Sequence, residues 1–164
     1  MKTNATRLLE SAAIPHSLAH YEVDPEDLSA PKVAALIGMP ANQVFKTLLA
    51  KGDVTGFLFA VIAGDQELDL KALARTSGNR SIALLPVSQL QSLTGYIRGG
   101  VTALASKKAY PVFLDESALA YPVIAVSAGI RGTQILIAPG DYRKATGATA
   151  GSFSRVPDPT AKGS

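Results

Sequence analysis

The sequence predicts a single α+β domain with a mostly antiparallel sheet, and three observations support this fold class. A chain of 164 residues is long enough to bury a substantial core without disulfides. Two apolar runs, 44–51 and 56–63, flank a Gly52-Asp53 corner and predict a central β-hairpin. Short helical segments stand at irregular intervals among the other strands, which is typical of α+β rather than parallel α/β architecture.

The individual elements follow from local sequence signals. Apolar residues at helical spacing and capping residues such as Ser29 and Asp69 mark helices. Helices are predicted over 3–13, 29–37, 69–76 and 87–93, and from Pro139 onward. Runs of β-branched and aromatic residues mark strands. Strands are predicted over 17–21, 44–51, 56–63, 82–85, 111–115, 123–127 and 133–137, the last two forming a hairpin across 128–132.

The C-terminal segment has a different composition. From Gly147 the residues are mostly small or polar, and prolines interrupt them. Such a segment buries little apolar surface and cannot easily offset the entropy of ordering. We therefore predict a domain over 1–146 and a frayed or disordered tail over 147–164.

Charge is distributed unevenly along the chain. Residues 1–70 carry 5 Lys+Arg against 9 Asp+Glu, and residues 71–164 carry 11 against 4, so the two parts have net charges of −4 and +7. A basic half can attract a polyanion such as nucleic acid, or it can be a solvated surface. The sequence leaves both interpretations open.

Composition also argues against several classes of protein. There is no cysteine, so disulfides and thiolate metal sites are excluded, as is typical of cytoplasmic proteins. His16 and His20 have a spacing that suits a metal only on a helix, whereas Pro15 favours extended chain, so we expect no metal and no cofactor. No apolar stretch reaches the roughly 20 residues that span a bilayer, so no membrane association is expected.

Lys46 lies in the middle of the first strand of the predicted central hairpin. Alternation places it on one face with Val44, Leu48 and Ala50, so a charged group stands among apolar neighbours. An ammonium in that position needs anions or water nearby. It either extends from a sheet edge into solvent or forms a positive group on the floor of a cleft.

Two further segments contain candidate site residues. Gly95–Gly100 has the glycine spacing of a P-loop, but Val101 and Thr102 replace the required Lys-Ser/Thr, so the segment is not a nucleotide loop. Its Gly99-Gly100 pair can present backbone N–H groups to a substrate, or it can form a tight turn. Ser127 ends a strand without the G-x-S-x-G context of a serine hydrolase.

These segments together resemble the YbaK/EbsC family of freestanding aminoacyl-tRNA deacylases, which is related to the editing domain of bacterial prolyl-tRNA synthetases. The resemblance covers roughly residues 4–146. It rests on four segments that occur in order: Val44–Leu49 (VFKTLL), Gly95–Val101 (GYIRGGV), Lys107-Lys108, and Val126–Gly132 (VSAGIRG). The combination is fairly specific, whereas each segment alone would be weak.

The resemblance implies a compact α+β domain with a barrel-like sheet flanked by helices. It also implies a trans-editing enzyme that cleaves the ester of mischarged Cys-tRNA(Pro), and also of Cys-tRNA(Cys), with the substrate thiol as the nucleophile. The expected partners are the acceptor end of the tRNA and, as a further candidate, prolyl-tRNA synthetase. Two alternatives stay open: an Ala- or Ser-tRNA deacylase that positions a water molecule, and a non-catalytic module that binds tRNA or a synthetase.

The resemblance assigns roles to thirteen residues. The expected catalytic residues are Lys46, Gly99, Gly100 and Ser127. The expected substrate-binding residues are Tyr21, Thr47, Val101, Gly129 and Gln134. The expected tRNA-binding residues are Arg98, Lys107, Lys108 and Arg131. The chain departs from the family pattern at Ala103, where relatives usually have proline, and at Gln134, where many have an acidic residue.

Overall fold

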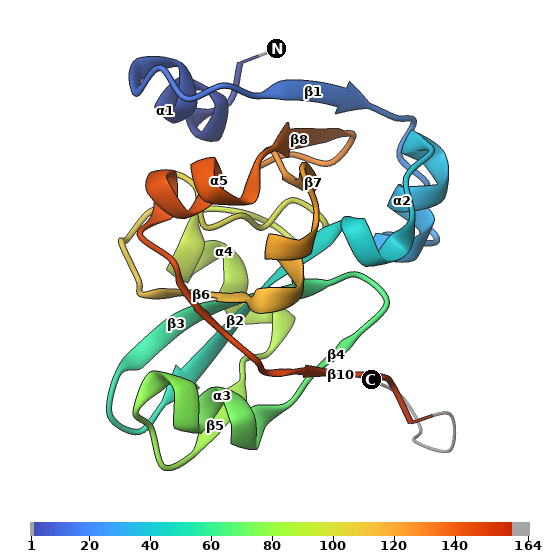
Figure 1. Cartoon of the computed structure of the whole chain (residues 1–164). Helices are drawn as coiled ribbons and strands as arrows, with labels where there is room; N and C mark the ends of the chain where they lie inside the picture. Colours follow the sequence, from blue (N-terminus) through green and yellow to red (C-terminus); the bar gives the residue numbers. More distant parts are fainter. Residues whose placement is uncertain (1, 159–164) are drawn as a thin grey trace.

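The computed structural model describes residues 2–158, which form a layered α+β domain and confirm the predicted fold class (Figure 1). The α-helices are α1 (Asn4–Ser11), α2 (Ala30–Ile37), α3 (Leu70–Ser77), α4 (Leu90–Thr94) and α5 (Pro139–Thr146), and the 3₁₀ helices are η1 (Ala41–Gln43), η2 (Val87–Gln89) and η3 (Glu116–Ala120). The strands are β1 (Ser17–His20), β2 (Phe45–Gly52), β3 (Gly56–Ala63), β4 (Glu67–Leu68), β5 (Ile82–Leu84), β6 (Val112–Asp115), β7 (Ile124–Ser127), β8 (Thr133–Ile137), β9 (Thr149–Gly151) and β10 (Ser154–Arg155).

A five-stranded sheet with the order β5-β2-β3-β6-β9 forms the centre of the molecule. The predicted hairpin of β2 and β3 is confirmed, and its register runs from Phe45 opposite Ala63 to Gly52 opposite Gly56. β5 adds to β2 antiparallel, whereas β6 lies parallel to β3 and β9 lies parallel to β6. The sheet is therefore mixed.

Two smaller sheets complete the strand pairing. β1, β8 and β7 form an antiparallel sheet, which confirms the predicted hairpin of β7 and β8, and β10 pairs with β4. The barrel-like closure implied by the family resemblance is wrong, because the described strands form three separate sheets. Among the described residues, a single parallel bridge between Val44 and Ala125 pairs the central sheet with the three-stranded sheet.

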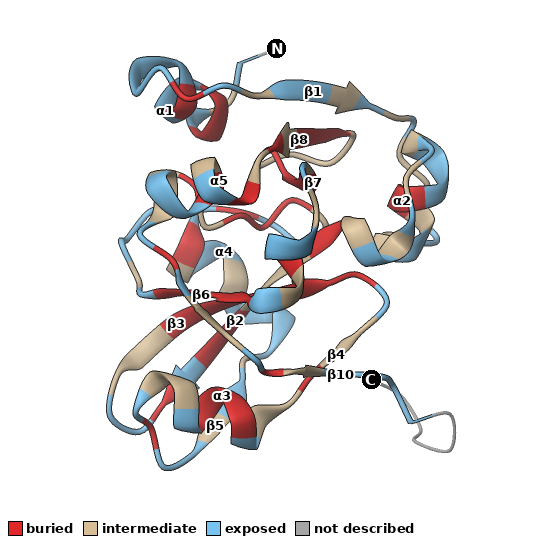
Figure 2. Ribbon diagram, viewed as in Figure 1, coloured by how far each residue is buried: buried red, intermediate tan, exposed pale blue. Residues whose placement is uncertain are grey.

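Much of the central sheet is buried (red in Figure 2), and apolar side chains pack against both of its faces. On one face, Phe45, Leu49 and Phe59 pack with side chains from β7, β8, α1 and α5. On the other face, Ala50, Leu58, Ala60 and Ile62 pack with α3 and with Phe153. The alternation of side chains along β2 and β3 therefore builds two cores. Within the described residues, no helix has the length and apolar character that a membrane crossing requires.

The segment after Gly147 is ordered as far as the described residues extend, so the prediction of a frayed tail is wrong for that part. β9 pairs with β6, and the Phe153 ring is 1% exposed in the core beside α3. The buried carboxylate of Asp115 accepts hydrogen bonds from the backbone N–H groups of Phe153 (3.0 Å) and Ser154 (3.1 Å). One aromatic anchor and one buried carboxylate thus order a segment of small polar residues. Residues 159–164 lie outside the described part of the chain.

Candidate active site

A cavity opens along the edge of β2 that faces away from β3. β5 pairs with β2 only from Ala50 to Gly52, and the bridge to β7 involves only Val44. Between these points no described strand pairs with the edge of β2, and a cavity of about 490 Å³ lies beside it. It is lined by residues 26–30, Val33, 44–49, Leu84, Leu85, Val87, Leu90, Arg98, Gly99, Val101, Ser127 and Gln134.

The unpaired stretch of β2 presents backbone groups to this cavity. The N–H of Gly64 donates to the carbonyl of Val44 at 2.7 Å, which directs the backbone groups of Val44 toward β3. Hydrogen-bonding direction alternates along a strand, so the backbone groups of Thr47 point away from β3, toward the unpaired edge, whereas those of Leu49 lie where the pairing with β5 begins. At Thr47 the edge therefore offers a substrate a main-chain donor and acceptor that no other described strand uses.

Lys46 stands beside this edge with its ammonium half-buried. Its Nζ donates to the carbonyl of Gly64 at 3.3 Å. Burial lowers the pKa of Lys46, and the nearby carboxylates of Asp65 and Glu67 oppose that shift in part. No carboxylate lies within ion-pair distance of Nζ among the described residues. The side chain thus presents a positive charge, without a salt-bridge partner, to the cavity that it lines.

Ser127 and Gln134 form a polar pair on the neighbouring hairpin. They lie opposite each other on β7 and β8, and both line the cavity. The Ser127 hydroxyl accepts a hydrogen bond from the Gly129 N–H at 3.2 Å. Gln134 is 5% exposed, and its Oε1 has no hydrogen-bond partner among the described residues. Since a buried polar atom without a partner is costly, this carbonyl oxygen is available to a donor on a substrate.

A second pair of hydroxyls lies beneath the β2 edge. The Thr47 Oγ1 and the Tyr142 Oη are both buried, and neither makes a hydrogen bond within the described structure. Burial raises the pKa of Tyr142, against a smaller opposing effect of the Thr47 hydroxyl, so the phenol stays protonated at neutral pH. The packing of α5 against the sheet therefore brings an uncharged phenol to the underside of the site.

The glycine loop 95–101 packs closely against the hairpin loop 128–132 and is hydrogen-bonded to it. Arg131 donates through Nε to the carbonyl of Arg98 at 2.8 Å. A Cβ on Gly100 would come within 3.2 Å of the Ile130 Cα. Gly129 has φ +92, and a Cβ there would lie 2.9 Å from the Tyr96 ring. Glycine is required at these contacts because the two backbones approach without room for side chains.

The role predicted for the Gly100 amide needs revision. Its N–H donates to the carbonyl of Ile97 at 2.9 Å within the same loop, so it already has an acceptor. The N–H of Gly99 makes no hydrogen bond among the described residues, and Gly99 lines the cavity. Gly99 is therefore the better candidate for a backbone donor to substrate, while Gly100 serves the close packing of the two loops.

Tyr96 is a positioning residue that the sequence analysis did not single out. Its hydroxyl donates to the carbonyls of Leu104 (2.6 Å) and Ala105 (2.9 Å), and its ring lies against Gly129. Burial raises its pKa, so the hydroxyl remains a donor at neutral pH. Its place within the motif Gly95–Val101 was the signal that could have identified it. Ala103, where relatives usually have proline, packs partly buried against the main core.

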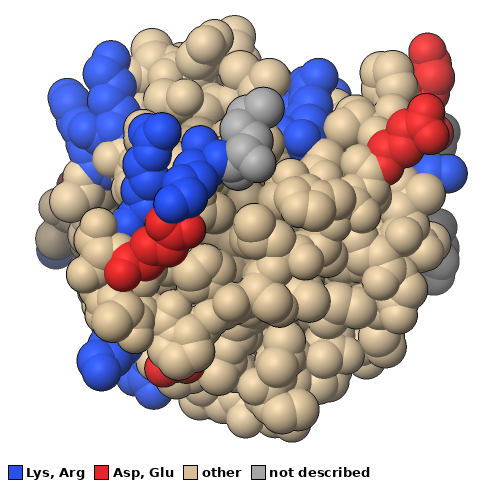
Figure 3. Space-filling model, turned by 90° about the horizontal axis from the view of Figure 1, so that it is seen from above, with Lys and Arg blue, Asp and Glu red and all other residues tan. Residues whose placement is uncertain are grey.

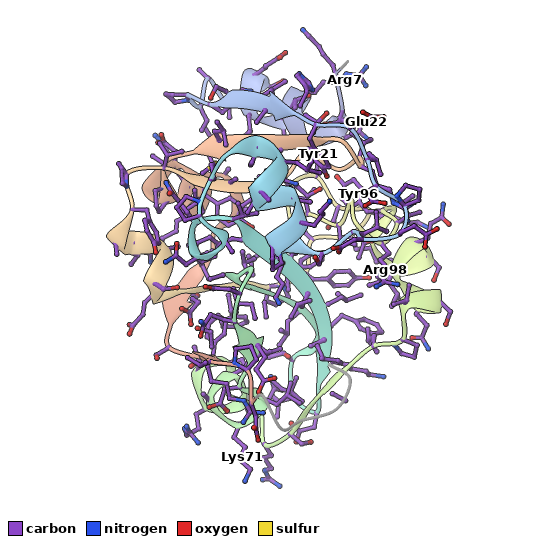
Figure 4. All side chains as sticks on the ribbon, turned by 90° about the vertical axis from the view of Figure 1, so that its right-hand side faces the viewer. Arg7, Tyr21, Glu22, Lys71, Tyr96 and Arg98 are labelled. Carbon is purple, nitrogen blue, oxygen red and sulfur yellow. The ribbon has the colours of Figure 1, made fainter. Side chains whose placement is uncertain are left out.

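The structure brings seven of the thirteen predicted site residues to the cavity. These are Lys46, Thr47, Arg98, Gly99, Val101, Ser127 and Gln134. The other six do not line it: Tyr21, Gly100, Gly129, Lys107, Lys108 and Arg131. Tyr21 instead donates its backbone N–H to the carbonyl of Gly132 at 3.0 Å. In Figure 4, Tyr21, Tyr96 and Arg98 follow one another along one side of the molecule, and Lys71 lies at the far end.

Lys107 and Lys108 do not line the cavity but are connected through α4 to one of its walls. Lys107 and Lys108 are exposed, and Lys107 is tied to the end of α4 by a hydrogen bond from its backbone N–H to the Thr94 carbonyl at 2.8 Å. α4 also carries Leu90, which lines the cavity. Seen from the end that carries α1 and β1, most Lys and Arg side chains gather toward one side (left in Figure 3). On this face of the molecule, basic side chains are thus concentrated toward one side.

Comparison with known proteins identifies the family. The sequence profile of the aminoacyl-tRNA editing domain matches residues 24–145. The chain belongs to this family. A protein of Enterococcus faecalis, provisionally named Cys-tRNA(Pro)/Cys-tRNA(Cys) deacylase EbsC, is 45% identical over 138 residues, which are 84% of each chain. The uncharacterized protein YwhH of Bacillus subtilis is 26% identical over 135 residues, which are 82% of each chain. The resemblance drawn from the sequence motifs is therefore confirmed.

Solved structures share the fold. A crystal structure described provisionally as a trans-editing enzyme for prolyl-tRNA synthetase has a TM-score of 0.79 and 23% identity, over 94% of this chain and 99% of its own. The crystal structure of a hypothetical protein has a TM-score of 0.85 and 22% identity, over 93% of this chain and 100% of its own. These matches show that the chain shares its arrangement of strands and helices with both solved structures.

Proposed function

We propose that this protein is a trans-editing deacylase that removes cysteine from mischarged Cys-tRNA(Pro), and also from Cys-tRNA(Cys). The observation that carries the proposal is the cavity at the β2 edge, where Lys46, Ser127 and Gln134 of an editing-family chain converge. The 45% identity with the Enterococcus faecalis protein supports the choice of cysteine. Such a protein would act in the cytoplasm, where tRNAs are charged, and prolyl-tRNA synthetase is the candidate protein partner.

Each lining group has a role in this proposal. The Lys46 ammonium holds the terminal phosphate or ribose, and the Gly99 N–H stabilises the negative charge that develops on the ester carbonyl oxygen. The unpaired backbone N–H of Thr47, on the open edge of β2, is a second candidate donor to that oxygen. Gln134 Oε1 accepts a hydrogen bond from the substrate α-ammonium or ribose hydroxyl, which satisfies an otherwise unpartnered buried atom.

The nucleophile in this proposal belongs to the substrate. The chain contains no cysteine, whereas a cysteinyl ester carries a thiol with an ordinary pKa of about 8.5. The thiolate sulfur bonds to its own carbonyl carbon, the bond from that carbon to the ribose oxygen breaks, and the released ribose oxygen takes the proton that the thiol lost. A cyclic thiolactone results, and water later opens it. Well-oriented intramolecular reactions can gain about 7–11 kcal/mol in this way.

A panel of charged tRNAs tests the proposal. Cys-tRNA(Pro) should be cleaved rapidly, and Ser- and Ala-tRNA(Pro) much more slowly, because a hydroxyl or a methyl group cannot replace the thiolate. Alkylation of the substrate thiol should abolish cleavage. The alkyl group also enlarges the side chain, so Ser-tRNA, which lacks the thiol but has no added group, separates loss of the thiol from steric obstruction. Equal rates on all three substrates would favour the alternative of a positioned water molecule in a broader Ala- or Ser-tRNA deacylase. Binding without cleavage of any of them would indicate a non-catalytic tRNA- or synthetase-binding module.

A further inference from the structure

We propose that four apolar side chains at the mouth of the cavity bind the base of the substrate's terminal nucleoside. These side chains are Leu84, Leu85, Val87 and Leu90, here called the apolar shelf, and all four line the cavity that contains Lys46 and Ser127. The inference rests on the proposed function, because an aminoacyl ester is joined directly to the ribose of the terminal nucleoside.

The shelf is anchored in the fold but uncovered on its outer side. Leu85 and Leu90 pack against the main core, which fixes their positions. Leu84 and Val87 are 50% and 56% exposed, although both belong to a cavity wall. Apolar side chains gain free energy when they leave water, and a cluster of exposed ones beside a cavity is typical of a binding surface.

The shelf lies further along the open edge of β2 than the groups that hold the ester. Val44 and Ala125 form a parallel bridge, so Ser127 stands alongside Lys46. Leu84 pairs with Ala50, four residues further along β2, which corresponds to about 13 Å of strand. With the ester carbonyl beside Ser127 and the ribose held by Lys46, the base extends along the open edge toward the shelf.

The size of the cavity and the presence of Arg98 in its wall support the same occupant, although Glu26 and Asp27 also line it. The volume of about 490 Å³ falls among pockets of roughly 300–1,000 Å³ that enclose whole small molecules, and a cysteinyl group alone would leave much of it empty. Arg98 lines the same cavity, and a guanidinium pairs well with the phosphate on the 5′ side of a terminal nucleoside. An apolar surface contacts the flat face of a base without reading its edge, so the shelf would tolerate different bases but require one.

Binding experiments test the shelf without catalysis. The probes are the trinucleotide CCA and the same trinucleotide with an abasic third position, titrated into the protein and followed by NMR. The double variant Leu84→Ser/Val87→Ser should bind CCA about tenfold more weakly than wild type does, which corresponds to about 1.4 kcal/mol. The same variant should bind the abasic probe with the affinity of wild type. The single variant Val87→Ser, outside any strand, repeats the test if the double variant unfolds.

The chain offers matched controls for these substitutions. Leu119 and Val54 are 46% and 67% exposed, and neither lines the cavity. The control variant Leu119→Ser/Val54→Ser loses the same atoms elsewhere and should bind both probes as wild type does. Three outcomes would overturn the proposal. The first is that wild type binds CCA and the abasic probe with equal affinity, and the second is that it does not bind CCA at millimolar concentration. The third outcome is that the shelf and control variants lose the same amount of affinity for CCA.

Catalysis separates this inference from the proposed function. Wild type should cleave 3′-O-cysteinyl adenosine faster than the methyl ester of cysteine, and the shelf variant should lose that preference while its rate on the methyl ester is unchanged. Cleavage of both esters at equal rates by wild type would overturn the shelf but not the deacylase. Base-dependent binding of CCA without cleavage of any ester would overturn the deacylase and leave the shelf supported.

Discussion

The substitution Lys46→Met should abolish deacylation while leaving the protein as stable as wild type or more stable. Methionine retains most of the aliphatic length of lysine but removes the half-buried ammonium, whose pKa is lowered chiefly by burial. Loss of one preorganised hydrogen-bond donor in an active site typically costs about 10²–10³ in kcat. The protein loses a long hydrogen bond of 3.3 Å to Gly64 and gains relief from desolvation, which solvent screening reduces because the ammonium is only half-buried, so we expect stabilisation of at most about 1 kcal/mol. For a chain of this length that corresponds to a rise in Tm of about 2–4 °C.

The pH dependence of this stability difference has a definite sign. The pKa of Lys46 is lowered in the folded state from 10.5, so the unfolded chain binds more protons in the pH range between the two values. Wild-type stability should therefore rise with pH through that range, and the advantage of Lys46→Met should be full at neutral pH and shrink as pH approaches 10.5. Thermal melts at several pH values, together with single-turnover deacylation, measure both effects.

Lys51→Met is the matched control for this experiment. Lys51 lies on the same strand, is exposed, and places its ammonium 5.3 Å from the centroid of the Phe57 ring. It does not line the cavity, so its substitution should leave deacylation unchanged. Retention of wild-type activity by Lys46→Met would show that Lys46 is only a solvated strand lysine. A fall in Tm of more than about 4 °C would show that its role is structural.

Two further predictions concern the loops and the basic surface. Gly129→Ala should destabilise the protein by about 1–3 kcal/mol in urea unfolding, because it combines an unfavourable φ of +92 with a close contact to the Tyr96 ring. The control Gly140→Ala, with open space around it, should not destabilise the protein. Equal effects of the two substitutions would contradict the close packing of the loops. Lys107→Ala/Lys108→Ala should reduce the slope of log affinity for tRNA against log salt by about 1.4–1.8, whereas Lys71→Ala, at the far end of the molecule, should not. An unchanged slope in the double variant would make this pair part of a solvated face.

Local signals in the sequence were sufficient for elements that depend on neighbouring residues. The caps at Ser29 and Asp69 were predicted, and both side chains accept hydrogen bonds from backbone N–H groups at the starts of α2 and α3. The ordered segment after Gly147 was missed because its anchors are remote. Phe153 is held by Asp115, 38 residues earlier, and by a core built from β2, β3 and α3. Composition describes the average segment, whereas a single buried aromatic residue decides whether this one is ordered.

The candidate site shows the same limit more clearly. The sequence placed Lys46 in the middle of a strand and left two interpretations, a lysine at a sheet edge or a positive group in a cleft. The structure combines them, because β5 stops pairing at Ala50 and β7 meets β2 only at Val44, so the edge beside Lys46 is also the wall of a cavity. No pattern within β2 specifies where β5 ends. An open strand edge gives the ammonium access to substrate while its stem stays among apolar neighbours. The gap between the central sheet and the three-stranded sheet is therefore a suitable place for the Lys46 ammonium, whose pKa is lowered by burial, and the interior of either sheet is not.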